Sequence, residues 1–140
     1  MSIEDLQPLI EAATQARLQS VAPFSNFLVG AAVRTEGGKV YTGCNVESAS
    51  YGLTVCAERV AVWKALSEGE RQFAAMAVVA DTESLTPPCG TCRQIIWEFC
   101  KGATIVLANL RGQKETVVIK DLLPRAFDAR FLKEGTRQKS

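Results

Sequence analysis

The stretch that most constrains the fold is the uninterrupted apolar run "FAAMAVVA" at residues 73–80. A strand with one solvent-exposed face alternates apolar and polar residues, whereas a strand covered on both faces is apolar throughout. A second run, "ATIVLA" at 103–108, has the same character. Covering both faces of a sheet requires helices on each side of it. The two runs therefore predict the centre of an α/β sheet between two helical layers.

The other elements follow from periodicity and turn residues. Residues 3–18 carry apolar positions at a helical period, with Ser2 as the candidate N-cap. Because Pro8 is tolerated only near a first turn, this helix is expected to begin late. The remaining expected elements are strands at 27–33 and 39–44 joined as a hairpin, helices from about residue 55 and over 90–100, a strand at 115–119 and a helical turn at 121–124.

This order predicts a three-layer α-β-α sandwich around a five-stranded mixed sheet with helices on both faces. The connection "NLRGQK" is too short for a parallel crossover, so the last two strands are expected to be antiparallel. We expect a single domain over residues 1–132. The polar tail at 133–140 is expected to be frayed.

Charge and cysteine content exclude several classes of protein. The chain has 16 basic and 15 acidic residues, scattered along it, which argues against a basic groove for nucleic acid. Its longest apolar run is too short to span a bilayer, and the acidic start "MSIEDLQPLI" does not resemble a signal peptide. Five cysteines, an odd number, indicate thiols kept reduced. We therefore expect a cytoplasmic protein that binds neither nucleic acid nor membrane.

Polar residues begin an otherwise apolar helix at "TVCAER", residues 54–59. Cys56, Glu58 and Arg59 fall within four positions there, and a buried helix rarely carries such charges without partners. A second cysteine motif, "PPCGTCRQ" at 87–94, places Cys89 and Cys92 at the start of another helix. Taken alone, this Cys-x-x-Cys pair fits a redox dithiol, half of a zinc site or two buried thiols.

Considered together, the two motifs favour a zinc site formed by Cys56, Cys89 and Cys92. Helix N-termini that follow sheet strands gather at one edge, and three thiolates leave the fourth position of one zinc ion open, as in a catalytic site. A structural zinc module would instead need Cys44 or Cys100 as a fourth ligand, since the chain has no histidine.

Two charged residues complete the predicted site. Glu58 can stand beside the metal and transfer protons, although it could also be a first-turn acid that the helix dipole favours. Arg59 opposes that dipole, and we interpret it as offsetting the charge of the three thiolates.

With these motifs the chain resembles the small homotetrameric zinc-dependent cytidine deaminases. The blocks that carry the resemblance occur in the family's order and cover roughly residues 5–127: they are "APFSNFLVGAAV", "GCNVESASYGLTVCAER", "PCGTCRQ" and "LLPRAF". The resemblance implies hydrolysis of cytidine or deoxycytidine to uridine or deoxyuridine and ammonia, as in pyrimidine salvage. It implies attack of zinc-bound hydroxide on C4 of the pyrimidine, with Glu58 as the proton shuttle.

The resemblance also implies substrate-binding residues. Phe24 would pack against the pyrimidine, Asn45 and Glu47 would bind the ribose hydroxyls, and the backbone near Ala57 would contact the base. Tyr51 and Phe127 would reach the site of a neighbouring subunit. The residues alone leave other readings open, namely core packing for Phe24 and turn capping for Asn45 and Glu47.

Two rival functions remain at this point. A deaminase of a modified cytosine nucleoside or an aminonucleoside antibiotic would use the same metal site with a different pocket. A dithiol redox protein would use Cys89 and Cys92 and would leave Cys56, Glu58 and Arg59 without a role.

Overall fold

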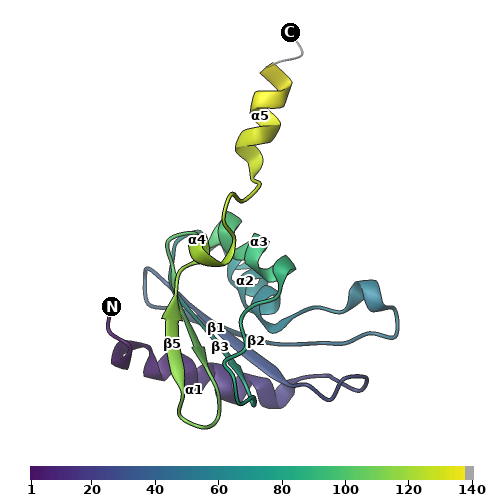
Figure 1. Cartoon of the computed structure of the whole chain (residues 1–140), viewed down its shortest axis with the longest axis vertical. Coiled ribbons are helices and arrows are strands. Elements are labelled where there is room, and N and C mark those ends of the chain that lie inside the picture. The colour runs from purple at the N-terminus through teal and green to yellow at the C-terminus, as the bar shows by residue number, and fades with distance from the viewer. Residues whose placement is uncertain (138–140) are drawn as a thin grey trace.

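The computed structural model of the chain describes residues 1–137, and it contains one five-stranded sheet in the order β2-β1-β3-β4-β5 (Figure 1). The strands are β1 (Val29–Thr35), β2 (Val40–Cys44), β3 (Phe73–Ala80), β4 (Thr104–Ala108) and β5 (Lys114–Val117). Strands β3 and β4 pair in parallel, and the other three pairs are antiparallel. The predicted mixed sheet and the antiparallel last pair are therefore confirmed.

Helices cover both faces of this sheet, which confirms the three-layer sandwich. Helix α1 packs on one face, and α2 and α3 pack on the other (Figure 1). The helices are α1 (Gln7–Ala16), α2 (Ala57–Ser67), α3 (Gly90–Phe99), α4 (Ile119–Leu122) and α5 (Ala129–Arg137), with short 3-10 turns at η1 (Glu4–Leu6), η2 (Arg17–Gln19) and η3 (Tyr51–Leu53). No helix within residues 1–137 combines the length and apolar character that crossing a membrane requires.

The two hydrophobic cores explain why β3 lacks polar residues. Its side chains alternate between the faces: Met76 and Val78 join the core beneath α2 and α3, while Ala77 and Val79 join the core beneath α1. Strand β4 alternates in the same way. A polar residue at any of these positions would be buried on one face or the other.

One glycine fixes the distance between the sheet and the helix that begins the site. A Cβ atom at Gly43 of β2 would collide with the backbone of α2, most severely with the carbonyl oxygen of Ala57. Glycine therefore allows the first turn of α2 to lie directly on β2. This contact places Cys56, the residue that precedes α2, at one end of the sheet.

The first helix begins as expected, with one difference in its cap. Pro8 lies in the first turn of α1, so its missing amide removes no intrahelical hydrogen bond. Ser2 does not cap α1. Its hydroxyl instead accepts a hydrogen bond from the Asp5 amide, at 3.4 Å, within the preceding turn η1.

The structure describes residues 133–137 of the predicted tail as part of helix α5. Asp128 initiates this helix, since its Oδ1 accepts a hydrogen bond from the Arg130 amide at 3.0 Å, as an N-cap residue does. The expected domain boundary at residue 132 falls inside the same helix. Helix α5 extends away from the sheet (Figure 1). Residues 138–140 lie outside the described part of the chain.

Candidate active site

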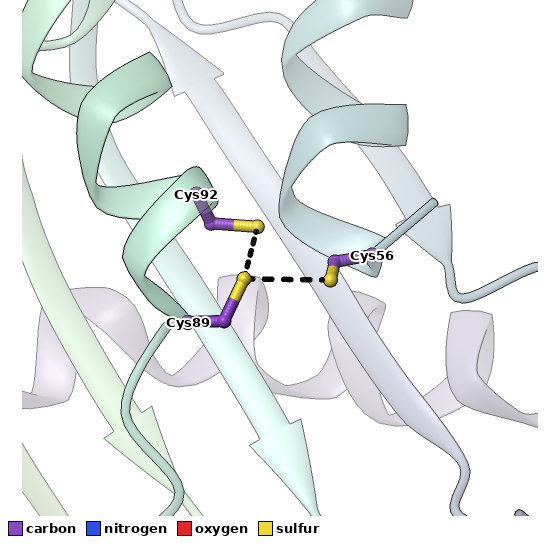
Figure 2. A group of neighbouring side chains, drawn as sticks. All are labelled: Cys56, Cys89 and Cys92. Carbon is purple, nitrogen blue, oxygen red and sulfur yellow. Dashed lines mark hydrogen bonds between the residues drawn. The ribbon is translucent and has the colours of Figure 1, made fainter. Parts of the chain in front are cut away.

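Three thiols from two helix N-termini converge at one end of the sheet. Cys56 is the N-cap residue of α2, Cys89 is the N-cap residue of α3, and Cys92 lies in the first turn of α3 (Figure 2). The Sγ atom of Cys89 lies 3.6 Å from that of Cys56 and 3.4 Å from that of Cys92. Thiolates around a tetrahedral zinc ion are separated by about 3.8 Å, given Zn–S bonds of about 2.3 Å. The donor set therefore fits zinc in both chemistry and spacing.

The cluster contains three ligands and no more within the described residues. All three sulfurs lie within 4.8 Å of one another, and neither Cys44 nor Cys100 joins the group. Cys100 is buried, and burial raises the pKa of its thiol to about 12, so it stays protonated. A three-ligand set leaves one tetrahedral position available, which is typical of a catalytic zinc site.

The electrostatics of the thiols also indicate a cation. A hydrogen bond from Cys92, followed by one from Arg59, lowers the pKa of the Cys56 thiol to about 5 despite partial burial. The same interaction with Cys56, together with burial, raises the pKa of Cys92. The Cys56 thiolate thus forms readily, whereas deprotonation of Cys92 needs a positive ion beside the sulfurs.

Glu58 lies in the first turn of α2, two residues after Cys56, and only 4% of it is exposed. Burial raises the pKa of its carboxyl to about 7, and the nearby Cys56 charge adds to that effect. The metal-ligand group among the described residues does not include Glu58. A carboxyl that stands beside a metal site and is easily protonated is suited to proton transfer.

Arg59 contacts the thiol cluster from the following position of α2. Its Nη2 donates to the Cys56 sulfur at 3.8 Å and to the Thr54 carbonyl oxygen at 3.4 Å. Burial alone would lower the pKa of the guanidinium, but its bonds and attraction to Cys56 outweigh that cost and raise it. Arg59 Nε is buried and has no hydrogen-bond partner among the described residues. The guanidinium is thus held against the Cys56 sulfur.

A pocket of about 320 Å³ opens beside the thiols, near the lower end of the range of about 300–1,000 Å³ for small-molecule sites. Its apolar wall combines a ring with aliphatic side chains, and its polar wall combines two carboxylates, an amide, hydroxyls and two thiols. The lining residues are Ser25, Phe27, Val29, Asn45, Glu47, Thr54, Val55, Cys56, Ala57, Glu58, Val78, Thr86, Pro87 and Cys89.

The comparisons with known proteins agree with this geometry. Residues 3–108 match the family model described as the cytidine and deoxycytidylate deaminase zinc-binding region. The chain belongs to this family. The matched region is zinc-binding, and Cys56, Cys89 and Cys92 form a group that could hold such an ion.

Individual relatives support the same assignment. The chain is 47% identical over 135 residues to a cytidine deaminase of Sporosarcina psychrophila, covering 96% of this chain and 99% of that protein. It is 51% identical over 126 residues to a cytidine deaminase of Halalkalibacterium halodurans, covering 89% and 96%. The crystal structure of cytidine deaminase from Burkholderia pseudomallei superposes with a TM-score of 0.83 at 49% identity, covering 91% of this chain and 100% of that one.

Asn45 and Glu47, predicted to bind sugar in this deaminase family, do line the pocket, but both already bond the loop before β1. Asn45 donates from Nδ2 to the Phe27 carbonyl at 2.7 Å and accepts from the Val29 amide at 2.9 Å. Glu47 accepts from the amides of Phe24 and Ser25 at 2.9 and 3.1 Å, and from the Ser25 hydroxyl. These contacts match the turn-capping interpretation and fix the loop that forms one wall.

Of the other predicted substrate residues, Ala57 lines the pocket, whereas Phe24, Tyr51 and Phe127 are absent from its lining. Phe24 and Tyr51 pack edge to face at 6.2 Å between ring centroids and line a neighbouring hollow. Tyr51 is 79% exposed. Phe127 is 56% exposed and stacks on Phe131 of α5, with ring centroids 5.8 Å apart.

The sequence analysis missed Phe27, which supplies the aromatic ring of the pocket. Phe24 and Phe27 stand three residues apart in one polar loop, so composition alone gives neither priority. Asn26 decides between them, because it adopts a left-handed backbone conformation with φ of 60°.

The sequence analysis also missed a support behind the opposite wall. The buried Asn109 donates from Nδ2 to the carbonyl oxygens of Thr82 and Glu83, at 2.9 and 3.2 Å. The Thr82 hydroxyl in turn lies 2.9 Å from that of Thr86, which lines the pocket. An asparagine after a buried strand is the available sequence signal, since it often caps a turn.

Proposed function

We propose that this chain catalyses the hydrolytic deamination of cytidine or deoxycytidine to uridine or deoxyuridine, with release of ammonia. One observation carries the proposal: Glu58 lines the same pocket of about 320 Å³ as Cys56 and Cys89, two of the three thiols that form the metal-ligand group. The relatives named cytidine deaminase, which align with nearly the whole chain, support the same reaction.

Cys56, Cys89 and Cys92 would hold the zinc ion in this reaction. When bound, zinc supplies a Lewis acid that activates water for attack on C4 of the pyrimidine. Arg59 and the N-termini of α2 and α3 lie against the thiolates and withdraw part of their negative charge.

Glu58 carries the protons. It accepts one proton from the attacking water and delivers it to N3 of the ring. It then passes the second proton of that water to the departing amino group, which leaves as ammonia while C4 becomes a carbonyl. Burial keeps the charged and the neutral forms of the carboxyl close in free energy, so each proton transfer requires little free energy.

The pocket walls suggest how the nucleoside lies. Phe27 is the pocket's aromatic ring and is proposed to stack on the pyrimidine. The Ala57 amide opens α2 and has no carbonyl of its own helix to bond, so it is free to donate to the base. Asn45 keeps one amide hydrogen and Glu47 keeps lone pairs beyond their loop contacts, which leaves both able to bind sugar hydroxyls.

A homotetramer with sites completed by neighbouring subunits forms a further part of the proposal. It is supported by the high exposure of Tyr51 and Phe127, which are apolar side chains without cover in one chain. Phe24 would then contribute through its contact with Tyr51. Mixing inactive Glu58→Gln and Phe127→Ala subunits should restore part of the activity, since some sites would combine two intact halves. No restoration would contradict shared sites.

A cytoplasmic location is also proposed, and the five free cysteines support it because oxidising compartments favour disulfides.

The deciding experiment measures ammonia release from a panel of substrates, with Glu58→Gln as the matched control. We expect turnover of cytidine and deoxycytidine and poor turnover of their 5′-monophosphates. Inclusion of modified cytosine nucleosides and an aminonucleoside antibiotic tests the first rival function. Disulfide reductase activity without ammonia release would instead indicate the redox rival at Cys89 and Cys92.

A further inference from the structure

Helix α3 carries two of the zinc ligands at its start and holds the C-terminal segment along its side. Three of its side chains donate to residues 122–128: Arg93 Nη1 to the Leu122 carbonyl at 2.9 Å, Gln94 Nε2 to the Phe127 carbonyl at 2.8 Å, and Trp97 Nε1 to Asp128 Oδ2 at 3.1 Å. Figure 1 shows α4 beside α3, with the chain then leaving toward α5. The segment that contains Phe127 is thus attached to the ligand-bearing helix.

Arg93 differs from the other two donors because it also bonds the ligand turn. Its Nε donates to the carbonyl oxygen of Pro88 at 2.8 Å, and its own amide donates to the Cys89 carbonyl at 2.9 Å. Pro88 is fully buried and directly precedes the ligand Cys89. One guanidinium therefore joins the peptide next to a ligand to the end of α4.

The Pro88 carbonyl needs this partner. It precedes α3 and cannot enter the hydrogen-bond ladder of the helix, and a buried carbonyl without a donor is costly. The Pro88–Cys89 peptide would relieve that cost by rotating, which would move the Cys89 sulfur away from the other two. Arg93 is absent from the pocket lining, so it acts on the site only through Cys89.

We propose that Arg93 is a positioning residue that fixes the Cys89 ligand and couples the zinc site to the C-terminal segment 122–128. This inference rests on the metal site of the proposed function. The planar guanidinium of Arg93 donates to two carbonyl oxygens in fixed directions, which a lysine ammonium cannot do in the same geometry. Ligand geometry and docking of the segment then stabilise each other.

The first test measures zinc release from the purified holoprotein to a chromogenic chelator, without nucleoside. Arg93→Gln and Arg93→Lys should release zinc about 10- to 100-fold faster than the parent, the range for losing a group that orients a ligand. Gln94→Ala, which loses only the bond to Phe127, should release zinc at the parent's rate. A parent-like rate in a folded Arg93→Lys protein would overturn the inference.

The second test needs no variant. Removing zinc from the parent protein with a chelator should increase amide hydrogen exchange in residues 122–128, because Arg93 anchors both the ligand turn at Pro88 and the segment at Leu122. Unchanged exchange there would also overturn the inference. A parent protein that holds no zinc would instead count against the proposed function, which keeps the two failures distinct.

Discussion

The Arg59 guanidinium lies 3.8 Å from the Cys56 sulfur, measured from Nη2 to Sγ, and it also lies 5.7 Å from the centre of the Trp63 ring. Of these two contacts, only the one to the sulfur bears on the chemistry of the metal site. Trp63 lies one turn further along α2 and is partly exposed.

Arg59→Gln should keep zinc and fold but lower kcat/KM most near neutral pH, with partial recovery as pH rises. Without the cation the thiolates keep more negative charge, so the attacking water loses its proton less readily. One pKa unit of that effect corresponds to about 1.4 kcal/mol, or tenfold. The pH profile of kcat/KM measures it. Trp63→Leu is the control and should keep the parent's profile, and an unshifted profile in Arg59→Gln would reject the charge-offset role.

Glu58→Gln should retain zinc and a parent-like melting temperature while losing roughly two to four orders of magnitude in kcat. The amide fills the same buried space but cannot carry a proton between the water and the base. Steady-state kinetics with metal analysis provide the measurement. The exposed Glu68→Gln should behave like the parent. A near-normal rate in Glu58→Gln would assign proton transfer to another group.

The metal motif could be predicted in full because its ligands lie in two short, recognisable blocks. Cys56, Cys89 and Cys92 meet as expected since each lies at a helix N-terminus beside the same sheet. The sheet could be predicted too, because β3 and β4 are buried on both faces and their sequences are therefore apolar almost throughout.

The pocket wall could not be predicted as well. Phe27 and not Phe24 lines the pocket, in a loop where Asn26 adopts a left-handed conformation, and no periodic pattern encodes such a loop. Helix α5 was missed because its first turn depends on contacts of Asp128 with Arg130 and with Trp97 of α3, the second of which is distant in sequence.

Cys89→Ala and Cys92→Ala should each lose the metal, whereas the parent should hold about one zinc per chain. Two sulfurs cannot satisfy the ion at this site, since no other described cysteine lies within reach. Elemental analysis of freshly purified, reduced protein tests this. Cys44→Ala is the matched control and should keep the parent's zinc content. An active protein without metal would contradict the mechanism.

Phe27→Ala should weaken nucleoside binding more than Phe24→Ala does. Stacking of a base on an aromatic ring is worth about 1–3 kcal/mol, so KM or an inhibitor Kd should rise roughly 5- to 150-fold. Inhibition constants for the product nucleoside, uridine, give a readout that does not depend on chemistry. Equal effects of the two substitutions would remove the proposed stacking role from Phe27.

Asp128 makes the stability of the C-terminal segment dependent on pH. Hydrogen bonds from Arg130 and then from Trp97 lower the pKa of its carboxyl to about 2, below its usual value of about 3.9. Its contribution is therefore present above about pH 4 and is lost as pH falls toward 2. Asp128→Asn should lower the melting temperature at pH 7, and the difference from the parent should shrink in that acid range.

Asp121→Asn, at an exposed position of α4, is the control for this effect and should show a small difference at every pH. A difference between Asp128→Asn and the parent that stays constant from pH 6 to pH 2 would mean that the charge of Asp128 does not hold the segment.

The close contact at Gly43 has a consequence for protein engineering. Because the backbones of β2 and α2 are in direct contact at Gly43, this contact fixes the position of Cys56 relative to the sheet. The exposed Trp63 of α2 is accordingly open to redesign without changing the ligand spacing, whereas Lys64 donates to the Thr42 carbonyl oxygen of β2 and helps to hold the contact. Any transplant of the three thiols into another scaffold should include this glycine, since the absence of a Cβ atom there lets α2 lie close enough to β2 to position Cys56.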